Sequence, residues 1–194
     1  VYAYDSFASE WGIGPQVIPL FEAQTGAKVK LVTRGDGGQV LASLIREKAD
    51  PQADVVIGLD ANLLPRARAE GVLLPHAAQG LPDIPADLRM DAEGLLTPFD
   101  YGYFTLVWDT EKLAVPPASM ADLTKPEFAK KLILLDPRTS TPGLGFLAAS
   151  LGAMPDGWKA WWKSLVPSIL TMAPGWDTGY GLFTQGEAPL VWSY

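Results

Sequence analysis

Strand-length apolar runs alternate with segments of helical periodicity along this chain, and this alternation limits the folds that the chain can adopt. Before a proline-rich stretch, strands are expected at 1–4, 29–33 and 54–58, and helices at 15–24, 40–48 and 63–70. Parallel strands joined by helices that cover the sheet are the natural assembly for such a series. The alternation therefore predicts an α/β fold.

The proline-rich stretch, 74–91, divides the pattern into two sets. In the second set, strands are expected at 132–135, 168–172 and 189–194, and helices at 143–151, 157–165 and 176–185. We therefore expect two lobes, 1–97 and 105–194, joined by a hinge crossing at 98–104. Tyr194 falls inside an apolar strand, so we expect the native chain to continue and a C-terminal segment to be missing here.

The carboxyl ends of the expected strands carry mainly aromatic and acidic side chains. Ligands of open α/β sheets bind beyond these ends. Tyr4, Trp11, Trp176 and Tyr194 lie at or shortly after strand ends, and could form an aromatic box for a flat or cationic ligand. A quaternary cation over an aromatic face gains on the order of 0.5–2 kcal/mol. Asp36 could accept hydrogen bonds from an amine on the same ligand. The alternative is that these aromatic residues only pack.

The turn Thr139–Gly143 precedes an expected helix. Free backbone N–H groups at a helix start favour an anion, and the Ser140 and Thr141 hydroxyls would add donors for a phosphate or carboxylate. The alternative is that Ser140 or Thr141 only caps the helix, with Pro142 in its first turn. The motif alone favours the capping interpretation.

Composition excludes several kinds of chemistry. The chain has no cysteine and one histidine, His76, so thiol nucleophiles, disulfides and Cys/His zinc sites are ruled out. The net charge is −7, with scattered Lys and Arg, which argues against nucleic acid as a partner. No loop has the spacing of a calcium site. We expect neither a catalytic residue nor a metal site.

Several sequence blocks are similar to those of the periplasmic thiamine-binding proteins of bacterial ABC importers. The resemblance covers the whole chain in order, and the blocks that carry it are Tyr2-Ala-Tyr-Asp-Ser-Phe7, Trp11-Gly-Ile-Gly-Pro15, Ala53–Leu64, Pro98-Phe-Asp-Tyr-Gly-Tyr-Phe104, Asp136–Gly145 and Gly175–Tyr194. It implies a two-lobed, type II periplasmic-binding fold that closes on its ligand in the cleft between the lobes.

The resemblance also implies the ligand and a role for each candidate residue. Thiamine, thiamine monophosphate or thiamine diphosphate would be the ligand, with no cofactor. Tyr4 and Tyr194 would stack on its rings and Asp36 would accept the aminopyrimidine amine. The remaining roles fall to Trp11 and Trp176 as pocket walls, and to Ser140, Thr141 and Gly143 at the phosphate or hydroxyethyl end. The chain would be a monomeric, non-enzymatic carrier that delivers its ligand to ABC permease subunits, in the periplasm after loss of a signal peptide.

The chain departs from the family pattern where a cysteine pair after the first helix is replaced by Thr25-Gly26-Ala27. Two other functions stay open on residues alone. A carrier of the same fold for ferric ion or a polyamine is one, although ferric carriers resembling this fold use adjacent tyrosines, and no Tyr-Tyr pair occurs here. A thiamine-degrading enzyme of similar fold is the other, although it requires a nucleophilic cysteine.

Overall fold

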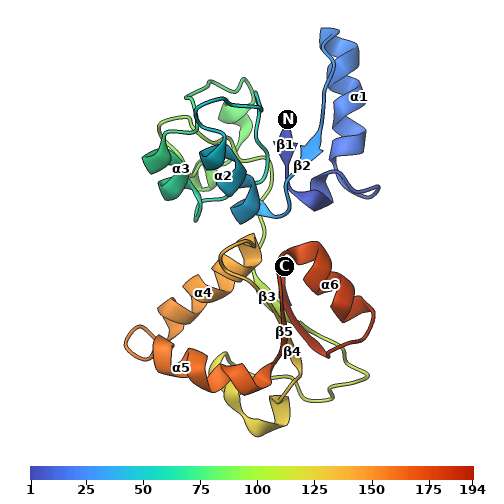
Figure 1. Cartoon of the computed structure of the whole chain (residues 1–194), viewed down its shortest axis with the longest axis vertical. Helices are drawn as coiled ribbons and strands as arrows, with labels where there is room; N and C mark the ends of the chain where they lie inside the picture. The colour runs from blue at the N-terminus through green and yellow to red at the C-terminus, as the bar shows by residue number, and fades with distance from the viewer. The chain divides into compact units, whose positions relative to one another are not determined.

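A computed structural model describes residues 1–194, and the chain divides into two compact units. Unit 1 is Val1–Gly102 and unit 2 is Tyr103–Tyr194, so the boundary falls inside the segment 98–104. Helices and strands alternate along both units (Figure 1). The predicted α/β class is confirmed.

Unit 1 contains a small parallel sheet that begins at the second residue. Strand β1 (Tyr2–Ala3) pairs in parallel with β2 (Val32–Thr33). On its other side, Tyr2 forms a single parallel bridge to Val56. The third strand predicted for this sheet is therefore wrong as a full strand. The pairing ends at Val56, two residues before Gly58. At Gly58 a φ of 108° turns the backbone out of the extended conformation.

The helices of unit 1 lie close to the predicted ranges. They are α1 (Gly14–Thr25), α2 (Gly37–Arg46) and α3 (Leu64–Glu70), with 3-10 turns η1 (Asp5–Phe7), η2 (Leu81–Asp83) and η3 (Ala86–Leu88). Helices α1 and α3 end at Gly26 and Gly71, both in the left-handed conformation that glycine adopts without strain. Helix α1 carries the predicted apolar spacing, yet Val17, Leu20 and Phe21 are 39%, 66% and 49% exposed.

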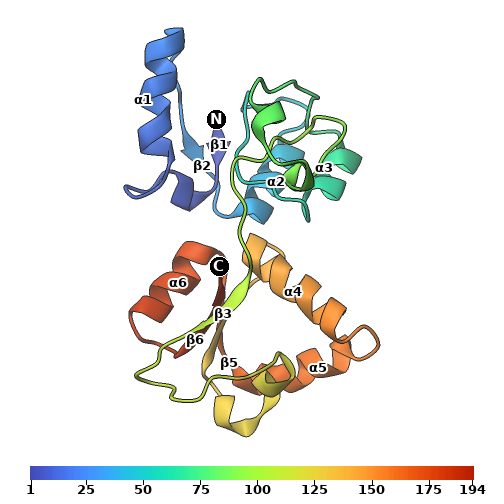
Figure 2. The ribbon, with the colours of Figure 1, turned by 180° about the vertical axis from the view of Figure 1, so that it is seen from behind.

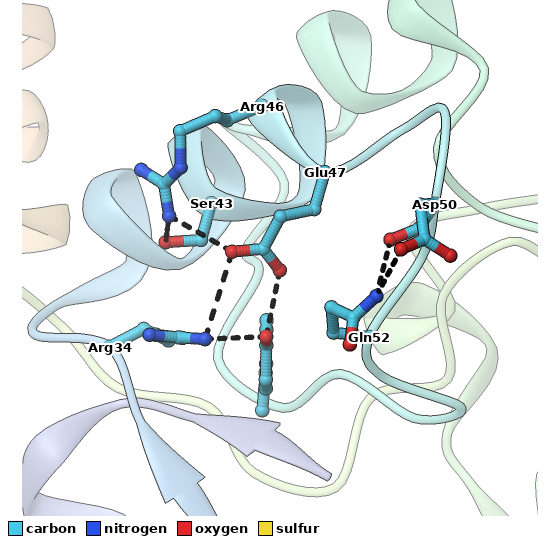
Figure 3. Close-up of polar contacts among 7 residues, drawn as sticks. Arg34, Ser43, Arg46, Glu47, Asp50 and Gln52 are labelled. Atoms are coloured by element: carbon cyan, nitrogen blue, oxygen red, sulfur yellow. Dashed lines mark hydrogen bonds and ion pairs between the residues drawn. The ribbon is translucent and has the colours of Figure 1, made fainter.

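A polar network joins β1 and Arg34, the residue after β2, to the C-terminal end of α2. The Tyr2 hydroxyl donates to Glu47 Oε2 at 2.7 Å and accepts from Arg34 Nη2, and the Arg34 guanidinium lies 4.3 Å from the Tyr2 ring centroid. Figure 3 shows Arg34 and Arg46 both directed at the Glu47 carboxylate. The Tyr2 hydrogen bond is the main reason that the pKa of Glu47 is lowered. The network fixes α2 against β1 and β2. Tyr4 and Asp36 lie just beyond the ends of these two strands.

The proline-rich stretch of unit 1 ends at a buried carboxylate. The Asp91 side chain is 0% exposed and accepts hydrogen bonds from the backbone N–H groups of Glu93, Leu95 and Leu96. Arg68 of α3 donates to the same carboxylate at 3.0 Å. Burial acts to raise the pKa of Asp91, but the three amides and Arg68 outweigh it and lower the pKa.

Unit 2 is built around a mixed four-stranded sheet. Its strands, in spatial order, are β3 (Thr105–Trp108), β6 (Leu190–Ser193), β4 (Leu132–Leu135) and β5 (Ile169–Ala173). Strands β6 and β5 pair in parallel with β4, and β3 pairs antiparallel with β6 at the edge. All four residues of β4 and of β6 are buried, as expected for central strands covered on both faces.

Helices cover both faces of this sheet. Helices α4 (Thr141–Ala153) and α5 (Trp158–Leu165) lie on one face and α6 (Trp176–Thr184) on the other (Figure 2). Successive residues of β4 alternate between the faces. Leu132 and Leu134 join the core cluster under α4 and α5, and Ile133 joins the cluster under α6. The 3-10 turns of this unit are η4 (Ala121–Thr124), η5 (Pro126–Phe128) and η6 (Val166–Ser168).

Candidate ligand-binding site

In unit 1, the structure brings Tyr4 and Asp36 to neighbouring strand ends. Tyr4 follows β1 and Asp36 follows β2, and two hydrogen bonds join the ends: Asp5 N to Gly35 O at 2.8 Å, and Gly35 N to Asp5 Oδ1 at 3.0 Å. The pKa of the Tyr4 phenol is raised by burial, and further by the nearby carboxylates of Asp100 and Asp36. An aromatic ring therefore lies among negative charges at this edge.

Asp36 is also the N-cap of α2. Its Oδ1 accepts from the Gly37 N–H at 2.8 Å, and the Gln39 side chain accepts from the Asp36 N–H at 3.1 Å, completing a capping box. Because the cap holds the carboxylate in one rotamer, its acceptor oxygens have a defined direction before any ligand arrives. The position selected from the sequence thus has a structural role, and its role in ligand binding stays a prediction.

Tyr4 is held in place by its neighbours in unit 1. The Phe7 ring meets the Tyr4 ring edge-on at 5.9 Å, and Gly58 lies so close that an added Cβ would come within 2.4 Å of Tyr4 Cδ1. Trp11 lies in the turn before α1 and is 66% exposed. The structure thus brings Tyr4 and Asp36 together, and a role for Trp11 as a pocket wall stays a prediction.

Asp100 was missed by the sequence reasoning. The residue is exposed, yet partial desolvation raises the pKa of its carboxyl, and its charge acts on Tyr4. In the sequence it stands in the segment interpreted as a hinge, with no spacing that relates it to Tyr4. Only its acidic character within an aromatic stretch could have drawn attention to it.

In unit 2, Ser140, Thr141 and Gly143 form the buried start of α4. Ser140 is the N-cap, and its hydroxyl accepts from the Gly143 N–H at 3.3 Å, so the capping interpretation is confirmed. A Cβ on Gly143 would come within 2.6 Å of the Leu135 carbonyl, so only glycine allows α4 to begin this close to β4. A role in holding an anion remains a prediction, and the cap does not exclude it.

The loops that follow β4 and β5 are joined to each other. The Asp136 N–H donates to the Ala173 carbonyl at 2.8 Å, and the Thr139 hydroxyl donates to the Pro174 carbonyl at 2.5 Å. The Arg138 guanidinium pairs with Asp136 and lowers the pKa of that carboxyl. The start of α4 and the start of α6 are therefore held at the same edge of the sheet.

Trp176 and Tyr194 lie together at this edge. Trp176 opens α6, and Tyr194 directly follows β6, with ring centroids 6.5 Å apart and planes at 59°. Tyr194 also lies 5.1 Å from Phe104. The predicted aromatic residues of unit 2 are thus in contact, while Tyr4 and Trp11 belong to unit 1.

Two further observations concern the whole of residues 1–194. No group of three or more His, Cys, Asp or Glu side chains is arranged to hold a metal ion. None of the helices combines the length and the apolar character of a membrane-spanning segment.

The fold and the polar and aromatic residues at its strand ends define a class of ligand-binding protein. Residues 50–191 match the family described as bacterial extracellular solute-binding protein, and the chain belongs to this family. Along its whole length it is 44% identical to a thiamine-binding periplasmic protein of Brucella abortus and 42% identical to that of Escherichia coli. A solved structure named periplasmic thiamin binding protein superposes with a TM-score of 0.86 at 41% identity, covering 100% of this chain.

The chain spans 58% and 59% of the lengths of these two relatives, and 60% of the solved chain. The predicted periplasmic-binding fold is confirmed by the superposition, and membership of a solute-binding family is established. The candidate site residues are tested by none of these comparisons and stay predictions.

Proposed function

We propose that this chain recognises thiamine or a thiamine phosphate and serves a periplasmic carrier that delivers the ligand to an ABC importer. The observation that carries the proposal is the 44% identity along the whole chain to a protein named for thiamine binding. The resemblance noted in the sequence and the chemistry of the strand ends support the same ligand.

The ligand chemistry suits the candidate residues of each unit. Thiamine carries a permanent positive charge on one flat ring and an amine on the other. A cation is favoured beside aromatic faces and carboxylates, and Tyr4 lies close to the charges of Asp36 and Asp100. Asp36, oriented by its cap, would accept a hydrogen bond from the amine.

Residues of unit 2 would recognise the rest of the ligand. Trp176 and Tyr194 offer aromatic faces for a ring. The N–H groups at the start of α4, with the Ser140 and Thr141 hydroxyls, would hold a hydroxyl or phosphate end. No step of bond making or breaking is proposed, so the ligand would be released chemically unchanged.

The test is a calorimetric titration of the natural full-length polypeptide with thiamine, thiamine monophosphate and thiamine diphosphate. Ferric citrate and spermidine are the comparators. We expect saturable binding of at least one thiamine compound and none of the comparators. Binding of a comparator alone would keep the family and overturn the proposed ligand.

Three single variants test the site residues. Asp36→Asn and Trp176→Ala are each expected to weaken thiamine binding by about tenfold or more, because each removes a charged or aromatic contact of about 1.4 kcal/mol. His76→Ala is the control, since the hydrogen bond described for its ring joins the Thr97 hydroxyl rather than any candidate site residue. Equal affinity in all three variants would refute the assignment of the site.

A further inference from the structure

Trp176 is held by two neighbours that the sequence did not single out. Its indole ring is stacked on Tyr180, with centroids 4.9 Å apart and planes at 11°. Its Nε1 donates a hydrogen bond to the Ser193 hydroxyl at 2.8 Å. The stack fixes the tilt of the indole plane, and the hydrogen bond fixes its rotation within that plane.

Tyr180 is itself anchored to the core of unit 2. It lies one helical turn after Trp176 in α6, so the two side chains share a face. Tyr180 packs against the buried cluster that contains Ile133 and Val191. Helix α6 comes close to the sheet at Gly179, where an added Cβ would lie 2.2 Å from Leu135 Cδ2. The position of Tyr180 is therefore set by the sheet.

Ser193 supplies the second anchor from the end of β6. It is 2% exposed, and its backbone is paired opposite Thr105 of β3. A buried hydroxyl that accepts from an indole N–H has a fixed position, because the strand cannot move without breaking its ladder. The residue after it is Tyr194, so one strand end fixes both aromatic candidates.

We infer that Ser193 and Tyr180 are positioning residues that hold the Trp176 indole in the orientation required for a flat, cationic heteroaromatic ligand. The inference rests on the proposed function. Binding to an aromatic face depends on ring orientation, and a side chain already held in its bound rotamer loses less conformational entropy when the ligand arrives. Neither residue needs to touch the ligand to have this effect.

Unit 2 offers a matched control for the hydrogen bond. Trp162 Nε1 donates to the Ser150 hydroxyl at 2.9 Å, and Ser150 is 0% exposed. Ser150→Ala therefore removes the same kind of buried Trp–Ser hydrogen bond as Ser193→Ala, but between α4 and α5 rather than beside Trp176. A purely structural effect should appear in both variants, and a positioning effect only in Ser193→Ala.

The experiment measures the Kd for thiamine by calorimetry in the full-length protein and the two serine variants. We expect Ser193→Ala to bind about three- to tenfold more weakly, the range that loss of one hydrogen bond predicts, and Ser150→Ala to match the wild type. A Kd of Ser193→Ala within twofold of the wild type overturns the inference. So does equal weakening in both variants, because the loss would then come from the stability of unit 2.

A second pair of variants tests the stack. Tyr180→Leu removes the aromatic partner of Trp176, and Tyr180→Phe keeps the ring. We expect weaker binding in Tyr180→Leu and affinity within twofold of the wild type in Tyr180→Phe. Equal affinity in the leucine and phenylalanine variants contradicts a role for the stacked ring.

A spectroscopic readout separates positioning from loss of stability. In protein labelled with 5-fluorotryptophan, the 19F resonance of Trp176 is assigned by its disappearance in Trp176→Phe. We expect this resonance to shift or broaden in ligand-free Ser193→Ala and to be unchanged in Ser150→Ala. An unchanged Trp176 resonance in Ser193→Ala overturns the inference. Failure of the wild type to bind any thiamine compound overturns the proposed function, and this inference with it.

Discussion

Replacing Asp91 by asparagine should destabilise unit 1 more than any other isosteric change to one of its carboxylates. One oxygen of Asp91 accepts from Arg68 and the Glu93 N–H, and the other accepts from the Leu95 and Leu96 N–H groups. Whichever oxygen becomes an amide NH2, two donors lose their acceptor and face another donor.

The magnitude follows from these contacts. A hydrogen bond to a charged group contributes about 1.5–3 kcal/mol, so losing two predicts a cost of about 3–6 kcal/mol. A typical domain is stable by only about 5–15 kcal/mol. A loss of about 3 kcal/mol in a unit of this size would lower Tm by about 12 °C or more.

The effect should depend on pH in a defined direction. The pKa of Asp91 is lowered in the folded chain, so its ionised form stabilises the fold above its ordinary, unfolded pKa. That contribution is lost as the pH falls below about 4, through the folded pKa. The difference in stability between wild type and Asp91→Asn should therefore be constant near neutral pH and shrink in acid.

Thermal unfolding by circular dichroism gives Tm, and hydrogen exchange of the Leu95 and Leu96 amides reports local opening of this segment. Asp109→Asn is the control, because Asp109 accepts two backbone N–H groups in an exposed turn of unit 2. If Asp91→Asn lowers Tm no more than Asp109→Asn, or leaves the exchange of both amides unchanged, the reasoning from buried acceptors is refuted.

Two further predictions concern unit 1. Gly58→Ala should weaken thiamine binding, because the φ of residue 58 is 108° and the new Cβ would displace the Tyr4 ring from its present position. Calorimetry measures the affinity, and an unchanged affinity would contradict this prediction. Tyr2→Phe should raise the pKa of Glu47 toward its ordinary value, because the hydroxyl that lowers it is removed. A 13C NMR titration of the Glu47 carboxyl measures this, and an unchanged pKa would show that Arg34 and Arg46 alone account for the shift.

Strands β4, β5 and β6 of unit 2 could be predicted from the sequence because each is a run of mainly apolar residues, whereas β3 (Thr105–Trp108) was not among the expected strands. Leu132–Leu135 was predicted residue for residue, and it is buried throughout. In unit 1 the apolar runs are longer than the paired segments: the second expected strand pairs only at Val32–Thr33, and the third only at Val56. Apolar character indicates extended chain, but pairing also requires a partner strand that continues alongside.

The sequence could indicate a candidate site residue only where that residue both follows a strand and has a side chain suited to the ligand. Tyr4, Asp36 and Trp176 each follow a strand, and that rule needs no knowledge of neighbours. Ser193 and Asp100 act through side chains that are distant in sequence, Trp176 and Tyr4 respectively. Their roles depend on which chain segments the fold places together. The local sequence pattern does not show these contacts.

The burial boundary at the sheet edge has a consequence for protein engineering. Ser193 is 2% exposed, and the next residue, Tyr194, is 53% exposed. A combinatorial library at Tyr194 would therefore vary an exposed candidate ligand-binding side chain while keeping Ser193 and the buried strand that precedes it.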